Sequence, residues 1–423
     1  MIDALLQRRF VKSYSSNSQI YMKTIHDSLA ILTTWLLTVL SSAATDWPNW
    51  RGPNHDGISK ETTWDPAAAG KRKITWEAEV GAGYSAVAVA CGKVYTAGNF
   101  NKDTDAISCL DAATGKLLWK HEYPEPLAPK YYSGGCSATP TVNDDKVYFA
   151  SKSGKLFCLD ATTGKVLWKK EFASKVPTWG FSSSALILGK AVIFNAGSAG
   201  MAFDKDTGEV LWNSADDVCG YATPVPFGYN GQSALALFAK NTLTAISPDD
   251  GKLLWSYPWQ TEHDINAADP VISGNQAFIT SGYGRGCSLV DFSGTTPVKV
   301  WENKDMRAHM SGPVLIDGFL FGFDDNRLTC LDWKTGKVKW TEKSPKKGAL
   351  MAAGFNLIVL GENGRLAIVD ASPDSYKEIA AAQVVDGNCW TMPVLANGRI
   401  YIRNSDGHLA CLDVHKAGSP AMP

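Results

Sequence analysis

The segment from Glu262 to Asp269 carries the residue types best suited to chemistry in this sequence. It reads Glu-His-Asp-Ile-Asn-Ala-Ala-Asp, so several oxygen-bearing side chains lie close together along the chain. Ca²⁺ prefers several hard oxygen ligands, and a carboxylate can also act as a general base. We therefore take Glu262, Asp264 and Asn266 as candidate metal ligands, and Asp264 and Asp269 as candidate catalytic groups. Their spacing matches no calcium-loop motif that we recognise, so the alternative is that they are solvated or cap turns.

Two further sets of side chains could hold a cofactor or ligand. Arg307 and His309 offer hydrogen-bond donors to an anionic group. Aromatic residues near the starts of predicted strands form a stacking platform for a planar ring or a sugar if they turn inward, and ordinary packing if they turn outward. This aromatic set comprises Tyr84, Trp179, Phe181, Tyr221 and Trp390. From both sets we take as candidate cofactor-binding residues Arg307, His309, Trp179, Tyr221 and Trp390.

Residues 47–57 read Trp-Pro-Asn-Trp-Arg-Gly-Pro-Asn-His-Asp-Gly, a segment rich in aromatic, proline and glycine residues. This segment could line a site with Arg51, His55 and Asp56. The alternative, which we favour, is a strap whose two tryptophans pack on the outside of the domain. Irregular aromatic-rich segments often only cover apolar surface in this way.

A repeat predicts the elements that position these residues. Residues 159–169 read Leu-Asp-Ala-Thr-Thr-Gly-Lys-Val-Leu-Trp-Lys. Asp160 can bond the amides of a turn, Gly164 supplies the positive φ of a short hairpin loop, and the apolar residues that follow are typical of a strand. Near-copies begin at Asp111, Asp204, Ser247, Asp291, Asp332, Asp370 and Asp413. Their spacing of roughly 40 to 50 residues is that of four-stranded propeller blades, so eight anchors predict eight blades.

The two ends of the repeat region complete each other. The last period, which ends at Asp413, lacks a fourth strand, whereas residues 73–80 resemble one, with Trp76 in the tryptophan position. An N-terminal strand that completes the last blade closes the ring and removes open sheet edges. The predicted class is therefore all-β: an eight-bladed β-propeller of four-stranded antiparallel blades, closed by an N-terminal strand. The seventh period, at Asp370, has lost its tryptophan.

The cysteines do not predict a disulfide framework, although an exported protein would permit one. One group holds the same position on different blades, too far apart for a bond, and we interpret it as buried hydrophobic residues. This group comprises Cys109, Cys158, Cys330 and Cys411. A second group, near the starts of first strands, comprises Cys136, Cys219 and Cys389. We interpret these as unpaired structural thiols, with a reactive or metal-binding role as the alternative.

The pattern Leu-Asp-x-x-Thr-Gly-Lys-x-x-Trp resembles the repeat of the pyrroloquinoline quinone (PQQ) propeller superfamily, over residues 73–413. The resemblance implies an eight-bladed ring in which each tryptophan docks against a neighbouring blade. The residues in the docking position are Trp76, Trp119, Trp168, Trp212, Trp255, Trp301 and Trp340. In this superfamily, quinoprotein dehydrogenases bind PQQ and Ca²⁺ on the propeller axis and use an Asp base. Other members, such as the lipoprotein scaffold of the outer-membrane β-barrel assembly machinery, are not enzymes.

The dehydrogenase features that the resemblance implies are incomplete in this chain. The sequence has no adjacent Cys-Cys pair and no Cys-x-x-Cys-His haem motif, and the connections between its blades are mostly short. We therefore predict an exported binding or scaffold propeller, which contacts envelope proteins or a small ligand in the central funnel. The alternative is a compact PQQ- and Ca²⁺-dependent dehydrogenase that oxidises alcohols or sugars, with its site at residues 262–269 and Arg307.

The start of the chain predicts export. Lys23 precedes an apolar stretch, residues 29–40, and small residues up to Ala44, which is the order of a secretory signal if translation starts at Met22. The alternative is a buried or anchoring helix. The net charge of −1 gives no reason to expect a nucleic-acid partner. We expect a periplasmic or secreted monomer without a membrane span after cleavage, divided into a signal region (1–44), a leader (45–72), the propeller (73–413) and a tail (414–423).

Overall fold

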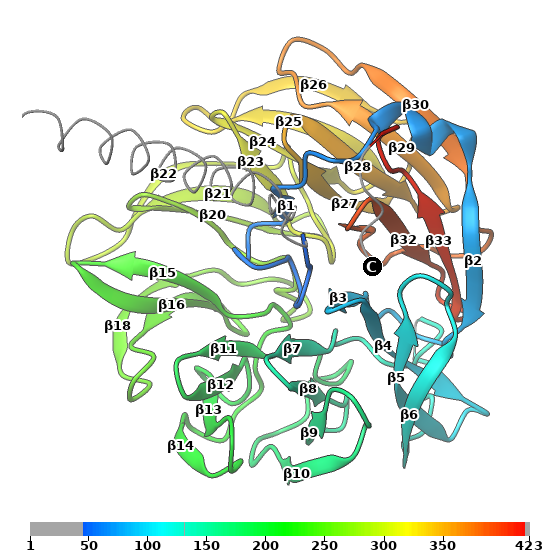
Figure 1. Ribbon diagram of the computed structural model, residues 1–423. Coiled ribbons are helices and arrows are strands. Elements are labelled where there is room, and N and C mark those ends of the chain that lie inside the picture. The colour runs from blue at the N-terminus through cyan, green and yellow to red at the C-terminus, as the bar shows by residue number, and fades with distance from the viewer. Residues whose placement is uncertain (1–44, 131, 419–423) are drawn as a thin grey trace, which may run out of the picture. The chain divides into compact units, whose positions relative to one another are not determined.

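The computed structural model describes residues 45–130 and 132–418. The predicted signal region and the last residues of the predicted tail lie outside this range. Within it, the strands form eight sheets arranged as a ring of blades (Figure 1). In each blade the first strand lies nearest the centre and the fourth at the periphery. The all-β, eight-bladed class is thus confirmed, and the described residues include no helix long and apolar enough to cross a membrane.

Blades 1 to 4 follow one another along the chain. Blade 1 contains β3 (Ala88–Ala90), β4 (Lys93–Phe100), β5 (Thr104–Asp111) and β6 (Leu117–Pro124). Blade 2 contains β7 (Thr141–Asn143), β8 (Lys146–Ala150), β9 (Lys155–Asp160) and β10 (Val166–Glu171). Blade 3 contains β11 (Leu186–Leu188), β12 (Ala191–Phe194), β13 (Met201–Asp204) and β14 (Val210–Asn213). Blade 4 contains β15 (Val225–Tyr229), β16 (Gln232–Phe238), β17 (Thr242–Ile246) and β18 (Leu253–Pro258).

Blades 5 to 8 complete the ring. Blade 5 contains β19 (Val271–Ser273), β20 (Gln276–Ser281), β21 (Gly286–Asp291) and β22 (Val298–Asn303), and blade 6 contains β23 (Val314–Ile316), β24 (Phe319–Asp324), β25 (Arg327–Asp332) and β26 (Val338–Glu342). Blade 7 contains β27 (Gly348–Ala353), β28 (Asn356–Gly361), β29 (Arg365–Asp370) and β30 (Glu378–Gln383), with β1 (Ile58–Ser59) added to β27. Blade 8 contains β31 (Val394–Ala396), β32 (Arg399–Arg403), β33 (His408–Asp413) and β2 (Ile74–Glu79), and the short 3₁₀ helix η1 (Pro66–Lys71) precedes β2.

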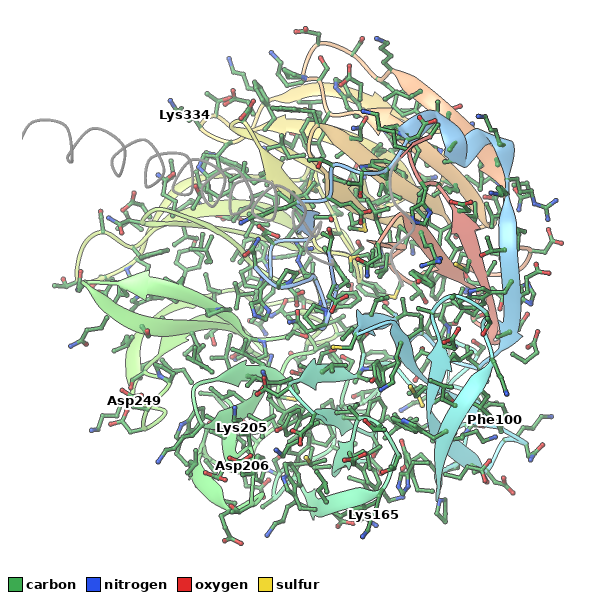
Figure 2. The ribbon with its side chains drawn as sticks, viewed as in Figure 1. Phe100, Lys165, Lys205, Asp206, Asp249 and Lys334 are labelled. Atoms are coloured by element: carbon green, nitrogen blue, oxygen red, sulfur yellow. The ribbon has the colours of Figure 1, made fainter. Side chains whose placement is uncertain are left out.

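The repeated turn joins the third strand of a blade to the fourth. Asp160 Oδ1 accepts hydrogen bonds from the backbone N–H groups of Thr162 and Thr163 and from the Thr163 hydroxyl. Gly164 has φ 71°, and a Cβ there would lie 2.5 Å from the ring of Trp119. Glycine is therefore required both by the backbone conformation and by the docked indole. Such turns lie on the periphery, where Figure 2 labels Lys165, Asp249 and Lys334.

The tryptophans of the repeat dock against the next blade. The indole Nε1 of Trp119 donates to Ala161 O at 3.1 Å. The equivalent bond is made by Trp76, Trp168, Trp212, Trp301 and Trp340. Trp255 Nε1 has no partner within residues 45–130 and 132–418, and its ring stacks on Phe292 with 5.0 Å between centroids. These contacts join neighbouring blades that share no strand pairing.

Blade 7 lacks the tryptophan because Ala380 holds its position, opposite Ile368 on β29. The helix η1 packs against β30 there, and a Cβ on Gly70 would lie 3.4 Å from Ala380. Asp65 N donates to Val414 O at 2.7 Å, and this carbonyl follows the anchor of blade 8 in the same way that Ala161 follows the anchor of blade 2. The leader therefore supplies the contact that the missing tryptophan would make.

Blade 8 combines strands from both ends of the propeller. β2 pairs antiparallel with β33, with Trp76 opposite Cys411. Arg403 on β32 makes a second link to blade 1, since its buried guanidinium donates to Gly81 O, Ser85 O, Thr96 Oγ1 and Ala97 O. Burial lowers the pKa of Arg403 to about 10, so the side chain keeps its charge at neutral pH.

The leader crosses the centre of the ring rather than its outside (dark blue in Figure 1). Trp47 exchanges two backbone hydrogen bonds with Val89 in blade 1, and Pro48 O accepts from Val142 N in blade 2. Further along, β1 pairs in parallel with β27 of blade 7. The prediction of an external strap is wrong, because backbone and side-chain bonds tie this irregular segment to inner strands on both sides of the ring. Trp47 is 1% exposed.

Candidate functional site

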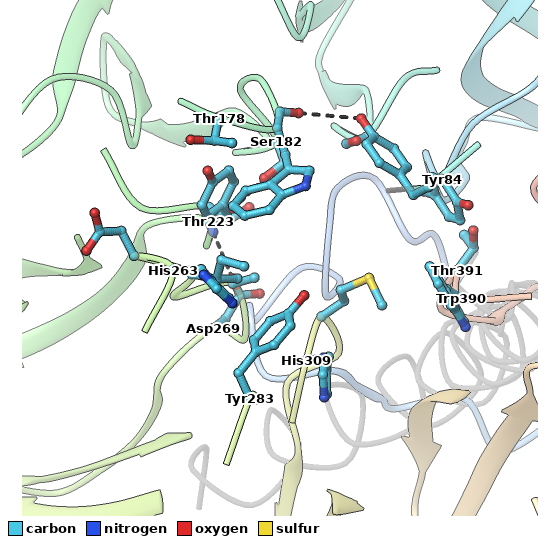
Figure 3. A pocket seen from close by; sticks show the side chains of 18 of the residues that line it. Tyr84, Thr178, Ser182, Thr223, His263, Asp269, Tyr283, His309, Trp390 and Thr391 are labelled. Atoms are coloured by element: carbon cyan, nitrogen blue, oxygen red, sulfur yellow. Dashed lines mark hydrogen bonds between the residues drawn. The ribbon is translucent and has the colours of Figure 1, made fainter. Parts of the chain in front are cut away.

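The connections that lead into the first strands of the blades surround a central funnel (Figure 3). Its volume is about 930 Å³, near the upper end of the range for pockets that hold small molecules. All eight connections contribute to the wall, and Trp50 of the leader lines it as well. The funnel is therefore built jointly by the repeat and by the segment that crosses the ring.

Aromatic side chains form separate groups on the funnel wall. In the first, which we call the Tyr84 group, Tyr84 stacks on Trp390 with 5.7 Å between centroids and 22° between planes, and also contacts Tyr132 at 5.7 Å. In the second, the Trp179 group, Trp179 meets the edge of Tyr221 at 6.0 Å. The predicted residues Trp179, Tyr221 and Trp390, together with Tyr84, thus line the funnel.

A third aromatic group joins residues that sequence patterns did not connect. Tyr283 contacts His263 at 5.3 Å and His309 at 4.8 Å, and Tyr283 itself is 47% exposed. We call this the Tyr283 group. Phe181, by contrast, does not line the funnel but is buried against Phe172, with 4.7 Å between centroids. Inward and outward orientations therefore both occur within the predicted aromatic set.

An inner belt of hydrogen bonds links the first strands of five blades. Ala86 N donates to Thr139 Oγ1, Thr139 N to Ser184 Oγ, Ser184 N to Thr223 Oγ1, and Thr223 N to Asp269 Oδ1, over distances of 2.7 to 3.1 Å. Each acceptor occupies the same position in its own blade, two residues before the first strand. The belt fixes the funnel wall, since every bond spans the gap between neighbouring blades.

Asp269 belongs to this belt and also contacts the leader. Its Oδ1 accepts from Thr223 N, while its Oδ2 accepts from Trp50 Nε1 and lies 3.9 Å from Arg51 Nε. Burial raises the pKa of Asp269, and the N–H donors together with the guanidinium oppose this shift. Both oxygens of Asp269 are thus engaged by the belt and the leader, and its catalytic role stays a prediction.

Arg51 anchors the leader at the funnel. Its side chain is 2% exposed, and its guanidinium donates to the carbonyl oxygens of Asp56, Gly312 and Pro313. Burial lowers the pKa of Arg51, and the negative charge of Asp269 is the largest effect that opposes this shift. Arg51 therefore joins the leader to blades 5 and 6 and does not present its charge to a ligand.

The predicted calcium ligands do not converge. Asn266 is fully buried; its Nδ2 donates to backbone carbonyls and its Oδ1 accepts from Ser281 Oγ. Glu262 is exposed and does not line the funnel, and Asp264 lines it but pairs with Lys240 at 3.6 Å. Within the described residues, no group of three His, Cys, Asp or Glu side chains is placed to hold a metal ion. The sequence predicted the atom types, but the backbone directs them apart.

Of the two predicted anion-binding residues, Arg307 and His309, only His309 lines the funnel. Arg307 pairs with Asp324 through a bond of 2.6 Å and with Asp325 at 3.1 Å, and the bond to Asp324 raises its pKa. His309 does line the funnel; its Nε2 lies 2.8 Å from Asp325 Oδ1, and burial lowers its pKa. The residues present thus do not fit the PQQ and Ca²⁺ pair that the resemblance implies, and we assign no redox step to the funnel.

The cysteines near the first strands are buried and do not line the funnel. Cys136, Cys219 and Cys389 are at most 1% exposed, and all are free thiols. Burial raises the pKa of each thiol, to about 12 for Cys219 and Cys389, which keeps it protonated at neutral pH. These three cysteines therefore act as small side chains of the hydrophobic core.

Several residues that line the funnel were not predicted from the sequence. Tyr132, Tyr283, Lys347 and Thr391 line the cavity without belonging to any motif. The inner belt did carry a signal: Thr139, Thr223 and Asp269 each precede a proline at the start of a first strand. Aligning the periods at these prolines would have placed Asp269 among structural threonines.

These features define an eight-bladed β-propeller with an aromatic central funnel and a leader that crosses the ring. The family model described as outer membrane protein assembly factor BamB matches residues 103–342, so the chain belongs to this family of PQQ-repeat propellers. No curated protein matches the sequence.

Solved structures of two functional kinds share the fold. BamB from Moraxella catarrhalis is 16% identical, with a TM-score of 0.60, over 79% of this chain and 99% of its own. The quinohemoprotein alcohol dehydrogenase ADHIIG from Pseudomonas putida HK5 is 12% identical, with a TM-score of 0.63, over 90% of this chain and 82% of its own. A europium-containing methanol dehydrogenase is 13% identical, with a TM-score of 0.63, over 86% of this chain and 88% of its own. At these identities the likeness concerns the fold alone.

Proposed function

We propose that this protein is a non-catalytic binding propeller of the cell envelope, with the central funnel as its binding site. The observation that carries the proposal is the state of Asp269, the buried carboxylate that lines the funnel. One of its oxygens is used by the inner belt and the other by Trp50 and Arg51 of the leader. A general base needs an oxygen that can accept the proton of the substrate, and each oxygen of Asp269 already accepts a hydrogen bond from the protein.

The proposed location and partners have separate support. The family is named after an outer-membrane assembly factor, and the start of the sequence has the order of a secretory signal. An exported propeller of this family would meet either envelope proteins or ligands present outside the cytoplasm. The funnel wall, lined by three aromatic groups, favours a ligand that enters the cavity.

The test is a titration of the mature protein with PQQ, with and without Ca²⁺, followed by tryptophan fluorescence and by reduction of an artificial electron-accepting dye. Trp50, Trp179 and Trp390 line the funnel, so a bound quinone would quench their emission. We expect neither saturable, Ca²⁺-dependent quenching nor dye reduction with alcohols and aldoses. A PQQ-dependent dehydrogenase run in parallel serves as the positive control.

The opposite result would replace the proposal by the dehydrogenase alternative. Saturable quenching at micromolar PQQ that requires Ca²⁺, together with dye reduction, would overturn the non-catalytic function. Asp264→Ala would then locate the site, because Asp264 is the half-exposed carboxylate on the funnel wall.

A further inference from the structure

We propose that the funnel binds a neutral oligosaccharide through its three aromatic groups. This inference rests on the proposed binding function and names the ligand class. A sugar ring has an apolar C–H face that packs on an aromatic ring and a polar edge of hydroxyl groups. The funnel offers both partners, because aromatic side chains lie among serine, threonine and histidine side chains on its wall (Figure 3).

The spacing of the aromatic groups favours a chain of rings over one flat cofactor. A planar ring held between two aromatic faces needs those faces about 7 Å apart, twice a normal contact distance. Tyr84 and Trp390 are nearly parallel, and their centroids are only 5.7 Å apart. These two rings already contact each other and leave no room for a planar ring between them. The three groups come from different connections of the ring, which suits successive sugar units.

The charges of the described wall residues leave no unpaired carboxylate for a cationic ligand. Asp264 lies 3.6 Å from Lys240, and Asp269 lies 3.9 Å from Arg51. His309 is held by Asp325, and burial lowers its pKa, so the imidazole is neutral at neutral pH. Lys347 lies over the ring of Trp390, 5.4 Å from its centre, and Lys130 is exposed on the wall. Both carboxylates are thus compensated within the protein. The two lysines have no carboxylate partner among the described residues, and the comparison with oligogalacturonate below tests whether a ligand uses their charge.

The experiment measures binding of maltohexaose, cellohexaose, laminarihexaose and xylohexaose to the mature protein by calorimetry and tryptophan fluorescence. We expect at least one hexasaccharide to bind saturably, about tenfold more tightly than its own disaccharide, because a longer chain reaches more than one aromatic group. Trp179→Ala and Trp390→Ala should each weaken binding by about tenfold through loss of the stacking face. Trp179→Tyr keeps a flat face and should retain most of the affinity.

Phe355→Ala is the matched control, because Phe355 is an aromatic residue that is 59% exposed and lies outside the funnel. It should leave binding unchanged. The inference is overturned if no hexasaccharide binds at millimolar concentration, or if Phe355→Ala weakens binding as much as Trp179→Ala does. It is also overturned if oligogalacturonate or decaproline binds more tightly than every neutral sugar. Those last outcomes would leave the binding function intact, whereas Ca²⁺-dependent binding of PQQ with dye reduction would remove it.

Discussion

The buried ion pair between Arg51 and Asp269 supports a stability prediction that also tests the structural role of Asp269. Asp269→Asn preserves the size of the side chain and an acceptor for Thr223 N, but it removes the charge opposite a guanidinium that is 2% exposed. Although burial raises the pKa of Asp269, we expect the carboxylate to be ionised at neutral pH. Two N–H donors and Arg51 surround it, and all of them favour the anion.

The magnitude follows from the loss of one partner in a buried pair. Such a loss costs about 3–5 kcal/mol, because the remaining charge stays buried without compensation. We therefore expect Asp269→Asn to lower the free energy of unfolding by this amount in urea titrations followed by tryptophan fluorescence and circular dichroism. The amides of residues 47–59 should also exchange hydrogen faster, since Arg51 anchors this part of the leader.

The matched control is Asp264→Asn in the same connection. Asp264 is half exposed and its lysine partner lies 3.6 Å away, so its replacement should cost no more than about 0.5 kcal/mol. In addition, the double variant Arg51→Met/Asp269→Asn should lose less stability than the two single variants together, because the groups are coupled. An Asp269→Asn protein that unfolds like the parent would mean that Asp269 is neutral in the folded state, and equal losses at both aspartates would refute the argument.

Three further predictions concern the ring. Arg403→Met should lower the free energy of unfolding by at least about 3 kcal/mol, because four buried acceptors of blade 1 lose their donor; an unchanged urea midpoint would contradict this. Bonds from Thr114 and Thr163 lower the pKa of Asp111 and Asp160, so the stability that these carboxylates contribute should be present above about pH 4 and be lost as the pH falls through their folded pKa. Thr163→Val should reduce this acid dependence of the urea midpoint, and an identical profile would count against the turn bonds. Deleting residues 73–80 should expose the edge of β33 and cause aggregation or loss of cooperative unfolding, whereas a monomeric variant that melts like the parent would rule this out.

The propeller could be predicted from the sequence because the blades repeat the same turn and the same docking tryptophan. Three features recur in phase: an Asp that accepts turn amides, a Gly with positive φ and a Trp that docks on the next blade. The well-formed copy at residues 159–169 therefore makes the weaker copies recognisable. The sequence also shows that the seventh period lacks the tryptophan, at the position that Ala380 holds. It does not show that the leader replaces the missing contact, because η1 and Asp65 belong to no period.

The funnel could be predicted only in part, for a different reason. Residue type indicates which atoms are available, but not where they point. Asn266 has the oxygen that a cation needs, yet its position in a buried connection directs that oxygen to Ser281. Trp179 and Phe181 lie two residues apart, and one lines the funnel while the other is in the core. Only the backbone path of each connection decides between these outcomes.

The leader couples the stability of the ring to the binding site. Trp50 lines the funnel, and its neighbour Arg51 holds blades 5 and 6 through buried hydrogen bonds. Asp65 and η1, further along the same segment, seal the one interface that has no docking tryptophan. A ligand that packs on Trp50 therefore contacts a segment that must stay in place for the ring to remain closed. By mass action, such a ligand stabilises the whole propeller and not only the funnel wall.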